Sequence, residues 1–217
     1  MVCAQLACAQ INDPTHLTIA YATVGGASRG TLKTVLKDIQ KPGHILKSGH
    51  YQEALPAQRE IEVEVFGKHF KAVYNPWRAD LFTAQKSTGV KNIETYSEFP
   101  GFVVSMMKGK LLWLRNLLLK RLINFLPEGP SEKQLEKGRT FVKAIAKNDN
   151  DESATLEIKG PEAYKFTVLC IEKMLYLITE ARDMSGFQTP SMFGTNWMKE
   201  LEEVEIKQYG THNTYKQ

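Results

Sequence analysis

The sequence predicts an α+β fold, in which helices pack on a mixed or antiparallel sheet. Two observations favour this class: β-rich runs occur in pairs joined by polar turns, and the helical segments form no repeating strand–helix unit with them. The chain has 217 residues, 42% of them hydrophobic and 24% charged, an ordinary globular composition. A chain of this length buries about 70% of its unfolded surface without a disulfide or a metal. We therefore expect a single domain over residues 1–217.

The predicted strands are rich in β-branched and aromatic residues and end at turn-forming residues. They are Leu17–Val24, Ile61–Val65, Phe70–Tyr74, Asn92–Tyr96, Phe141–Ala146 and Ala154–Lys159. Apolar residues alternate with glutamates in the second of these, which predicts a half-buried strand with an acidic outer face. Gly67-Lys68 and the polar run Asn148–Glu152 are the expected turns of two hairpins.

The predicted helices have apolar residues spaced three and four positions apart. They are Met1–Gln10, Leu32–Ile39, Ala79–Lys86, Gly101–Leu126, a short charged helix from Ser131, a long helix opened by Gly160-Pro161-Glu162, and Trp197–Leu201. The apolar stripe of the long helix consists of Tyr164, Val168, Ile171, Leu175 and Ile178.

The first helix lacks the basic start and long apolar core of a secretory signal. Asn12-Asp13-Pro14 ends it after few turns. A domain that opens in the middle of a helix leads us to expect that upstream sequence is missing or supplied by another chain.

The segment Gly101–Leu126 is both the most apolar and the most basic part of the chain. It holds five cations and no acid, so the rest of the +4 chain carries −1; the cations are Lys108, Lys110, Arg115, Lys120 and Arg121. A nucleic-acid surface spreads its basic residues over several elements, so we expect no nucleic-acid partner. A single membrane span is not expected either, because it would place these cations in hydrocarbon.

Two interpretations of this segment remain open. Its seven-residue apolar stripe is covered by the domain or by a partner, with the cationic heads reaching water along their aliphatic stems; the stripe is Val104, Met107, Leu111, Leu114, Leu118, Leu122 and Phe125. Alternatively the helix lies on an anionic membrane with its cations toward the lipid headgroups. We favour the covered stripe, and treat residues 101–139 as one helical basic-apolar segment with peripheral membrane affinity at most.

Cysteine and histidine usage predicts neither disulfides nor a metal site. Cys3, Cys8 and Cys170 are too few and too scattered for a disulfide framework, which favours a reducing, cytoplasmic compartment. The five histidines show no ligand spacing. None of the loop serines lies in a G-x-S-x-G elbow.

The run Gly25–Gly30, between a strand and a helix, has the setting of a phosphate-binding loop. It matches neither G-x-G-x-x-G nor the P-loop, since Thr31 stands where the P-loop lysine would follow. A glycine turn with a serine or threonine helix cap is the favoured interpretation. An anion-facing loop with Arg29 as the partner is the alternative.

Five motifs resemble, in their order, the saccharopine dehydrogenase-like oxidoreductases, a group that includes trans-acting enoyl reductases. They are Gly26–Leu32, Ser87–Tyr96, Gly129–Ser131 before Glu136–Arg139, Gly160–Tyr164, and Gly186–Ser191 with Phe193-Gly194. The resemblance runs from about Leu6 to Val204. It implies an NAD(P)-dependent activity in which hydride passes between the nicotinamide and an imine or enoyl-type substrate.

Members of that group begin with a nucleotide-binding Rossmann domain, which has no counterpart in this sequence. The resemblance therefore implies that residues 1–13 are the remnant helix after that domain, and that the rest is the substrate-binding and dimer-forming part. No NAD(P) is expected on this chain alone. The residues that match the family's cleft loops are Ser28, Arg29, Gly30, Thr31, Thr88, Gly89, Gln188, Thr189 and Pro190. No catalytic acid or base can be assigned.

The partners that follow are a second copy of the chain, a missing or separate Rossmann domain, and a small-molecule or lipid-like substrate. A non-catalytic lipid- or protein-binding module on the same scaffold is the alternative function, with membrane contact that is peripheral if it occurs.

Overall fold

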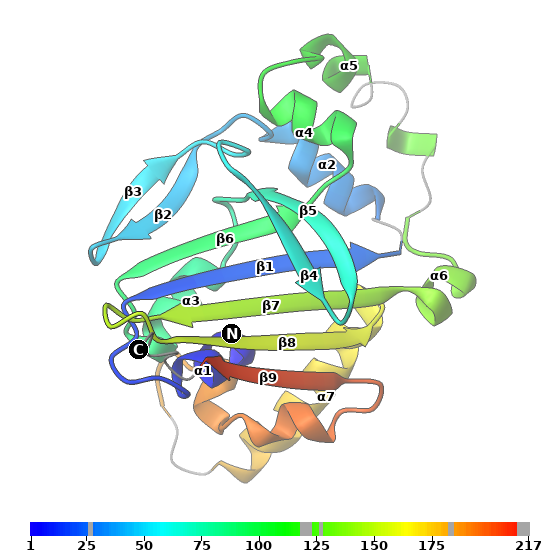
Figure 1. Cartoon of the computed structure of the whole chain (residues 1–217). Helices are drawn as coiled ribbons and strands as arrows, with labels where there is room; N and C mark the ends of the chain where they lie inside the picture. Colours follow the sequence, from blue (N-terminus) through cyan, green and yellow to red (C-terminus); the bar gives the residue numbers. More distant parts are fainter. Residues whose placement is uncertain (26–27, 118–122, 126–127, 182–184, 212–217) are drawn as a thin grey trace.

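The computed structural model describes residues 1–25, 28–117, 123–125, 128–181 and 185–211. Within these residues one mixed sheet of nine strands forms the centre of the molecule (Figure 1). The strands are β1 His16–Val24, β2 Gly43–Lys47, β3 His50–Ala54, β4 Glu60–Val65, β5 Lys68–Tyr74, β6 Asn92–Glu98, β7 Arg139–Lys147, β8 Ser153–Pro161 and β9 Glu205–Thr211. Their order is β3-β2-β6-β1-β7-β8-β9, and β5 pairs with both β4 and β6. The α+β prediction is confirmed.

The pair β1–β6 is parallel and every other pair of the described sheet is antiparallel. His16 lies opposite Asn92, and Tyr21 lies opposite Ser97. The carboxyl ends of β1 and β6 therefore meet at one edge of the molecule.

Helices and 3-10 turns connect and cover the strands. They are α1 Val2–Cys8, α2 Arg29–Lys37, α3 Asp80–Thr88, α4 Gly101–Met107, α5 Leu112–Leu117, η2 Ile123–Phe125, α6 Glu132–Lys137, α7 Ala163–Glu180, η3 Pro190–Phe193 and η4 Asn196–Glu200. Local chemistry fixes their ends: Ser131 and Gln134 form a capping box, and Glu162 caps α7. Gly89, at φ 71°, ends α3 in the left-handed conformation that glycine adopts without strain.

The sheet is covered on both faces. The helices α1, α3 and α7 lie behind it in Figure 1, over a core that includes Leu17, Ile19 and Ile93. The hairpin β4–β5 crosses in front, and packs Val63 and Phe70 against the opposite face. A third cluster joins α2 to α4.

Several elements differ from the sequence-based expectations. The strands β2, β3 and β9 were not predicted, and the helix expected over Gly101–Leu126 is broken. It ends at Met107, since Gly109 and Leu111 have φ of 80° and 56°, and it resumes as the short α5. The expected positions 118–122 and 126 lie outside the described residues. No helix in the described ranges is long and apolar enough to cross a membrane.

The long helix α7 also differs. Its predicted stripe points to solvent, with Val168, Ile171, Leu175 and Ile178 more than half exposed. A different set contacts the core: Phe166, Cys170, Met174 and Leu177. The helix has apolar side chains on nearly every face, so periodicity alone did not identify the buried one.

Candidate functional site

The predicted cleft residues Ser28 to Thr31 form the start of α2. The Ser28 hydroxyl accepts a hydrogen bond from the Thr31 N–H at 3.1 Å, and the Ser28 carbonyl accepts one from Leu32 at 3.0 Å. Arg29 pairs with Glu128 at 2.5 Å and donates to the Asn124 carbonyl at 3.3 Å. The predicted helix cap is therefore present at Ser28. Arg29, the residue expected to bind an anion in the alternative interpretation, is already paired with the Glu128 carboxylate.

The other predicted residues lie elsewhere. Thr88 donates to the Ala84 carbonyl at 2.7 Å and Gly89 closes α3, just before the first residue of β6. Because β1 and β6 run in parallel, this position is at the opposite end of β1 from Ser28. The structure does not bring these two groups together.

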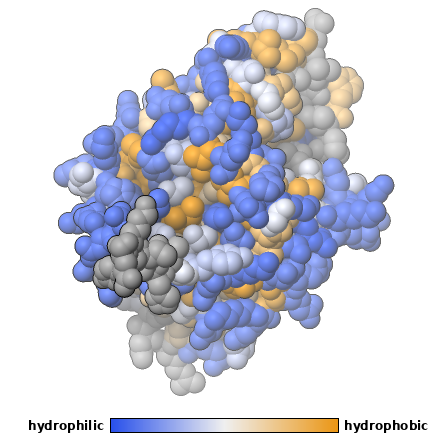
Figure 2. Space-filling model, viewed as in Figure 1, coloured by the Kyte–Doolittle hydropathy of each residue, from blue (hydrophilic) through white to orange (hydrophobic). Residues whose placement is uncertain are grey.

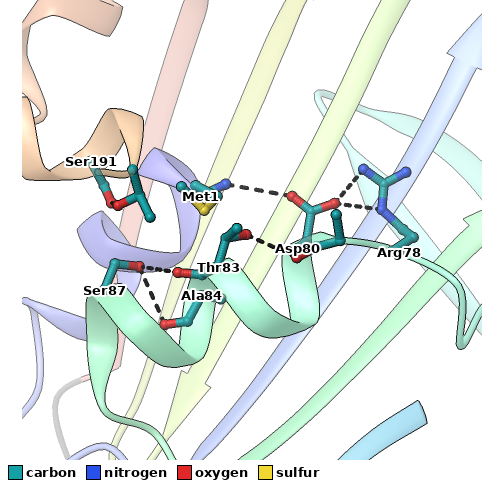
Figure 3. A network of polar contacts seen from close by, with 9 residues as sticks. Met1, Arg78, Asp80, Thr83, Ala84, Ser87 and Ser191 are labelled. Atoms are coloured by element: carbon teal, nitrogen blue, oxygen red, sulfur yellow. Dashed lines mark hydrogen bonds and ion pairs between the residues drawn. The ribbon is translucent and has the colours of Figure 1, made fainter. Parts of the chain in front are cut away.

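The third group, Gln188 to Pro190, lies beside α1 and α7. Thr189 is buried and its hydroxyl lies 3.1 Å from that of Ser191. Ser191 belongs to the η3 turn, which contacts α1 (Figure 3). Gln188, Thr189 and Pro190 line an apolar depression with Met174 and Ile178 of α7. The nine predicted residues thus fall into three places and form no single cleft.

A cavity of about 520 Å³ with mixed lining opens at the carboxyl ends of β1 and β6. Leu32, Val35 and Val103 are among its apolar walls; we name it the polar cavity for the hydroxyl, amide and charged side chains of its other walls. Of the predicted cleft residues only Thr31 lines it. Sequence reasoning missed its other polar residues, which are Tyr21, Thr23, Asn75, Arg78, Ser97 and Glu98.

The polar side chains of this cavity are there because, on one face of the sheet, the residues of β1 and β6 change from apolar to polar toward the carboxyl ends of the strands. On the face toward α1 and α7, β1 places Leu17 and Ile19 in the core and then presents Tyr21 and Thr23. β6 likewise passes from Ile93 to Thr95 and Ser97, both buried. A sheet face that is apolar at one end and rich in hydroxyl groups at the other is suited to a ligand at the polar end, because buried hydroxyls need hydrogen-bond partners.

Arg78 is held rigidly at the wall of the cavity. Its Nε and Nη2 contact Asp80 at 2.7 and 2.5 Å, and its guanidinium lies 4.4 Å from the centre of the Tyr21 ring. In Figure 3 the third nitrogen faces away from Asp80. One edge of the guanidinium therefore remains for an oxygen of a ligand.

The electrostatics of this pair are those of a partly buried ion pair. Burial opposes ionisation of Asp80, but the charges of Arg78 and of the Met1 amino group hold its pKa below the ordinary value. Burial raises the pKa of the Tyr21 hydroxyl, and Arg78 offsets part of that shift. Tyr21 is therefore a neutral hydrogen-bonding group near neutral pH.

A short network orients the opposite wall. The Asn75 amide donates to the Ser97 hydroxyl at 2.9 Å, and the Thr95 hydroxyl donates to the Asn75 carbonyl at 2.6 Å. Ser97 accepts in this network, so its own proton is available for a ligand. The Glu98 side chain makes no hydrogen bond or ion pair with the described residues, and partial burial raises the pKa of its carboxyl group.

An apolar groove of about 540 Å³ adjoins the cavity. Its walls come from α1, α7, η3 and η4, and include Phe166, Met174 and Trp197. Tyr21 lines both the groove and the polar cavity, so the two are neighbours on the same side of the sheet.

The start of α2 differs from a dinucleotide-binding turn. The turn into α2 lacks the glycine fingerprint, and the Ser28 side chain and carbonyl already accept the N–H groups of Thr31 and Leu32. Across the described ranges, histidine, cysteine and carboxylate side chains form no group of three that could hold a metal.

Comparison with known proteins supports a fold and nothing finer. No protein-family model matches the chain, and no curated protein sequence matches it. Among solved structures, it is similar to apo histidine-tagged saccharopine dehydrogenase (L-Glu forming) from Saccharomyces cerevisiae. The TM-score is 0.55 and the sequence identity 9%, over 97% of this chain and 71% of that chain. The chain therefore has a saccharopine dehydrogenase-like fold.

Proposed function

We propose that this chain is the substrate-binding part of an NAD(P)-dependent oxidoreductase, and that the substrate binds in the polar cavity. One observation carries the proposal: the cavity lies at the carboxyl ends of the two parallel strands, in a fold shared with a dehydrogenase. Open α/β sheets bind their ligands at the carboxyl ends of their parallel strands, and the cavity lies at the corresponding end of the one parallel pair of the described sheet.

The lining indicates the kind of ligand. The free edge of Arg78 suits a carbonyl or carboxylate oxygen, while Tyr21 and Ser97 offer hydroxyl groups to polar atoms. These residues would hold and orient an imine or enoyl-type substrate. Hydride chemistry belongs to the nicotinamide, which the described residues do not hold, so a nucleotide-binding domain outside them would supply it.

A second candidate function rests on the apolar groove. Its walls are apolar side chains and it runs beside the exposed face of α7, which suits a lipid chain or another protein. With such a ligand in the groove, the chain would be a non-catalytic binding module.

Nuclear magnetic resonance of the isotope-labelled chain separates the two candidates. The ligands are 2-oxo acids, amino acids, α,β-unsaturated acyl thioesters and a free fatty acid. The substrate proposal predicts amide shifts at Thr23, Ser97 and Glu98, caused by one of the first three classes. Shifts confined to Met174 and Leu175 on α7 would favour the binding module. No shift with any ligand would contradict both.

Two variants sharpen this test. Tyr21→Phe removes one cavity hydroxyl and keeps the ring under Arg78, so it is expected to weaken ligand binding about tenfold. Tyr209→Phe removes an exposed hydroxyl on β9 and is expected to leave binding unchanged. Equal effects of the two would place the ligand outside the cavity.

A further inference from the structure

The end of the molecule that carries α5 exposes large apolar side chains. Trp113 is 67% and Phe125 86% exposed, and Leu111 and Leu117 are also exposed. We name these four residues the α5 surface. Figure 2 shows hydrophobic side chains at the upper end of the molecule, where Figure 1 places α4 and α5.

The domain itself therefore leaves part of the predicted stripe uncovered, including Leu111 and Phe125. Its first two members, Val104 and Met107, pack in a core cluster with α2, together with Val103 and Met106, which were not in the predicted stripe. In α5 no residue is buried. The short helix is connected to α2 by Arg115, which donates hydrogen bonds to the backbone carbonyls of Leu36 and Lys37 at 2.8 Å each.

The charges around the α5 surface are mainly positive. Lys110 is exposed and makes no ion pair with the described residues, and Arg115 donates hydrogen bonds to carbonyl oxygens. Asp38, at the end of α2, pairs with Lys41 at 2.8 Å. Lys37, whose carbonyl Arg115 contacts, adds another exposed cation.

Two further acids near this end are also neutralised. Glu60 pairs with Lys108 as well as Lys71, and Glu128 pairs with Arg29. Asp38 interacts electrostatically with Lys37 and Arg115 as well as with Lys41, so the charges of these cations are partly compensated, whereas Lys110 makes no ion pair with a carboxylate of the described residues.

We propose that the α5 surface docks the protein on an anionic membrane. Exposed Trp, Phe and Leu side chains beside an excess of cations over acids match the two properties of such a surface, which are negative headgroups and the apolar boundary beneath them. Tryptophan in particular is favoured at the headgroup level. The contact is peripheral, because the apolar side chains enter only the boundary between the headgroups and the acyl chains, while the cations stay among the headgroups.

Vesicle flotation tests this proposal with the whole chain. We expect binding to vesicles that contain phosphatidylserine and phosphatidylcholine, little binding to phosphatidylcholine alone, and release at high salt. Trp113→Ala combined with Phe125→Ala is expected to weaken binding at least tenfold. The matched control is Phe187→Ala, which removes a side chain 69% exposed in the loop after α7 and should bind normally.

The contribution of the cations to vesicle binding is tested in the same flotation assay. Lys110→Glu is expected to weaken binding several-fold, whereas Lys47→Glu, on the distant β2–β3 hairpin, should not. All four apolar and charge variants change exposed side chains, so unchanged thermal unfolding verifies that they fold. Failure to bind anionic vesicles, equal binding to neutral vesicles, or full binding by the Trp113/Phe125 variant would each overturn the proposal.

Discussion

Arg78 lies at the boundary between two environments. On one side Asp80 holds two of its nitrogens; on the other the guanidinium covers the Tyr21 ring and reaches the polar cavity. A guanidinium held in this way loses little side-chain entropy when an oxygen binds its free edge. This pre-organisation adds to the position of the cavity at the strand ends as a reason to place the ligand here.

The ion pairs of a second residue, Glu60, predict how the stability of the folded state depends on pH. Its carboxylate pairs with Lys71 at 2.7 Å and with Lys108 at the end of α4, and these contacts lower its pKa to about 2. A lowered carboxyl pKa stabilises the folded state fully above the unfolded value, here 4.5, and this stabilisation is lost as the pH falls toward 2.

The measurement is the free energy of unfolding of Glu60→Gln relative to the wild type across this pH range. The difference should be constant above pH about 4.5 and shrink toward zero near pH 2. Glu62→Gln is the control, since Glu62 is exposed on the same strand and makes no ion pair within the described part of the chain. A Glu60 difference that does not change with pH would contradict the ion pairs as described.

The residues of the cavity could have been found in part from the sequence. Taking every second residue from Leu17 gives Ile19, Tyr21 and Thr23, and the same step from Ile93 gives Thr95 and Ser97. Both predicted strands therefore carry the change from apolar to polar. The parallel pairing that aligns the two changes joins residues 76 positions apart, and nothing local in the sequence predicts it.

Among the helices, α7 allows a direct test of which apolar face is buried, because one face packs on the core and the other is exposed. Phe166 packs on the core and against Gly160, while Leu175 is exposed. Phe166→Ala should lower the free energy of unfolding by about 2–4 kcal/mol, and Leu175→Ala by less than about 0.5 kcal/mol. Chemical denaturation measures both. A larger loss for Leu175→Ala would mean that the predicted stripe is the buried face.

Most other elements followed from local patterns. Alternation predicted β4, and turn residues predicted the β7–β8 hairpin. The hairpin β2–β3 was missed because His50, Tyr51 and Gln52 are all exposed, so no alternation marks the strand. The break after Met107 was missed because backbone conformation at Gly109 and Leu111, rather than apolar spacing, ends α4.

At the scale of the whole molecule, the exposed face of α7 and the adjoining groove predict self-association. An uncharged ridge beside an apolar groove is self-complementary, so a second copy can cover both through a twofold contact. Sedimentation at several concentrations should show a concentration-dependent dimer, which Leu175→Glu abolishes and Leu55→Glu, exposed at the end of β3, does not. A monomer at every concentration would contradict this prediction.

We expect this chain to bind substrate while the dinucleotide is held elsewhere. Calorimetric titration of NADPH and NADH into the chain tests this expectation, because the start of α2 is capped by Ser28 and Arg29 is paired with Glu128. We expect no saturable binding of either dinucleotide below millimolar concentration. A dissociation constant in the low micromolar range would contradict it, and would identify Gly25 to Gly30 as a nucleotide loop.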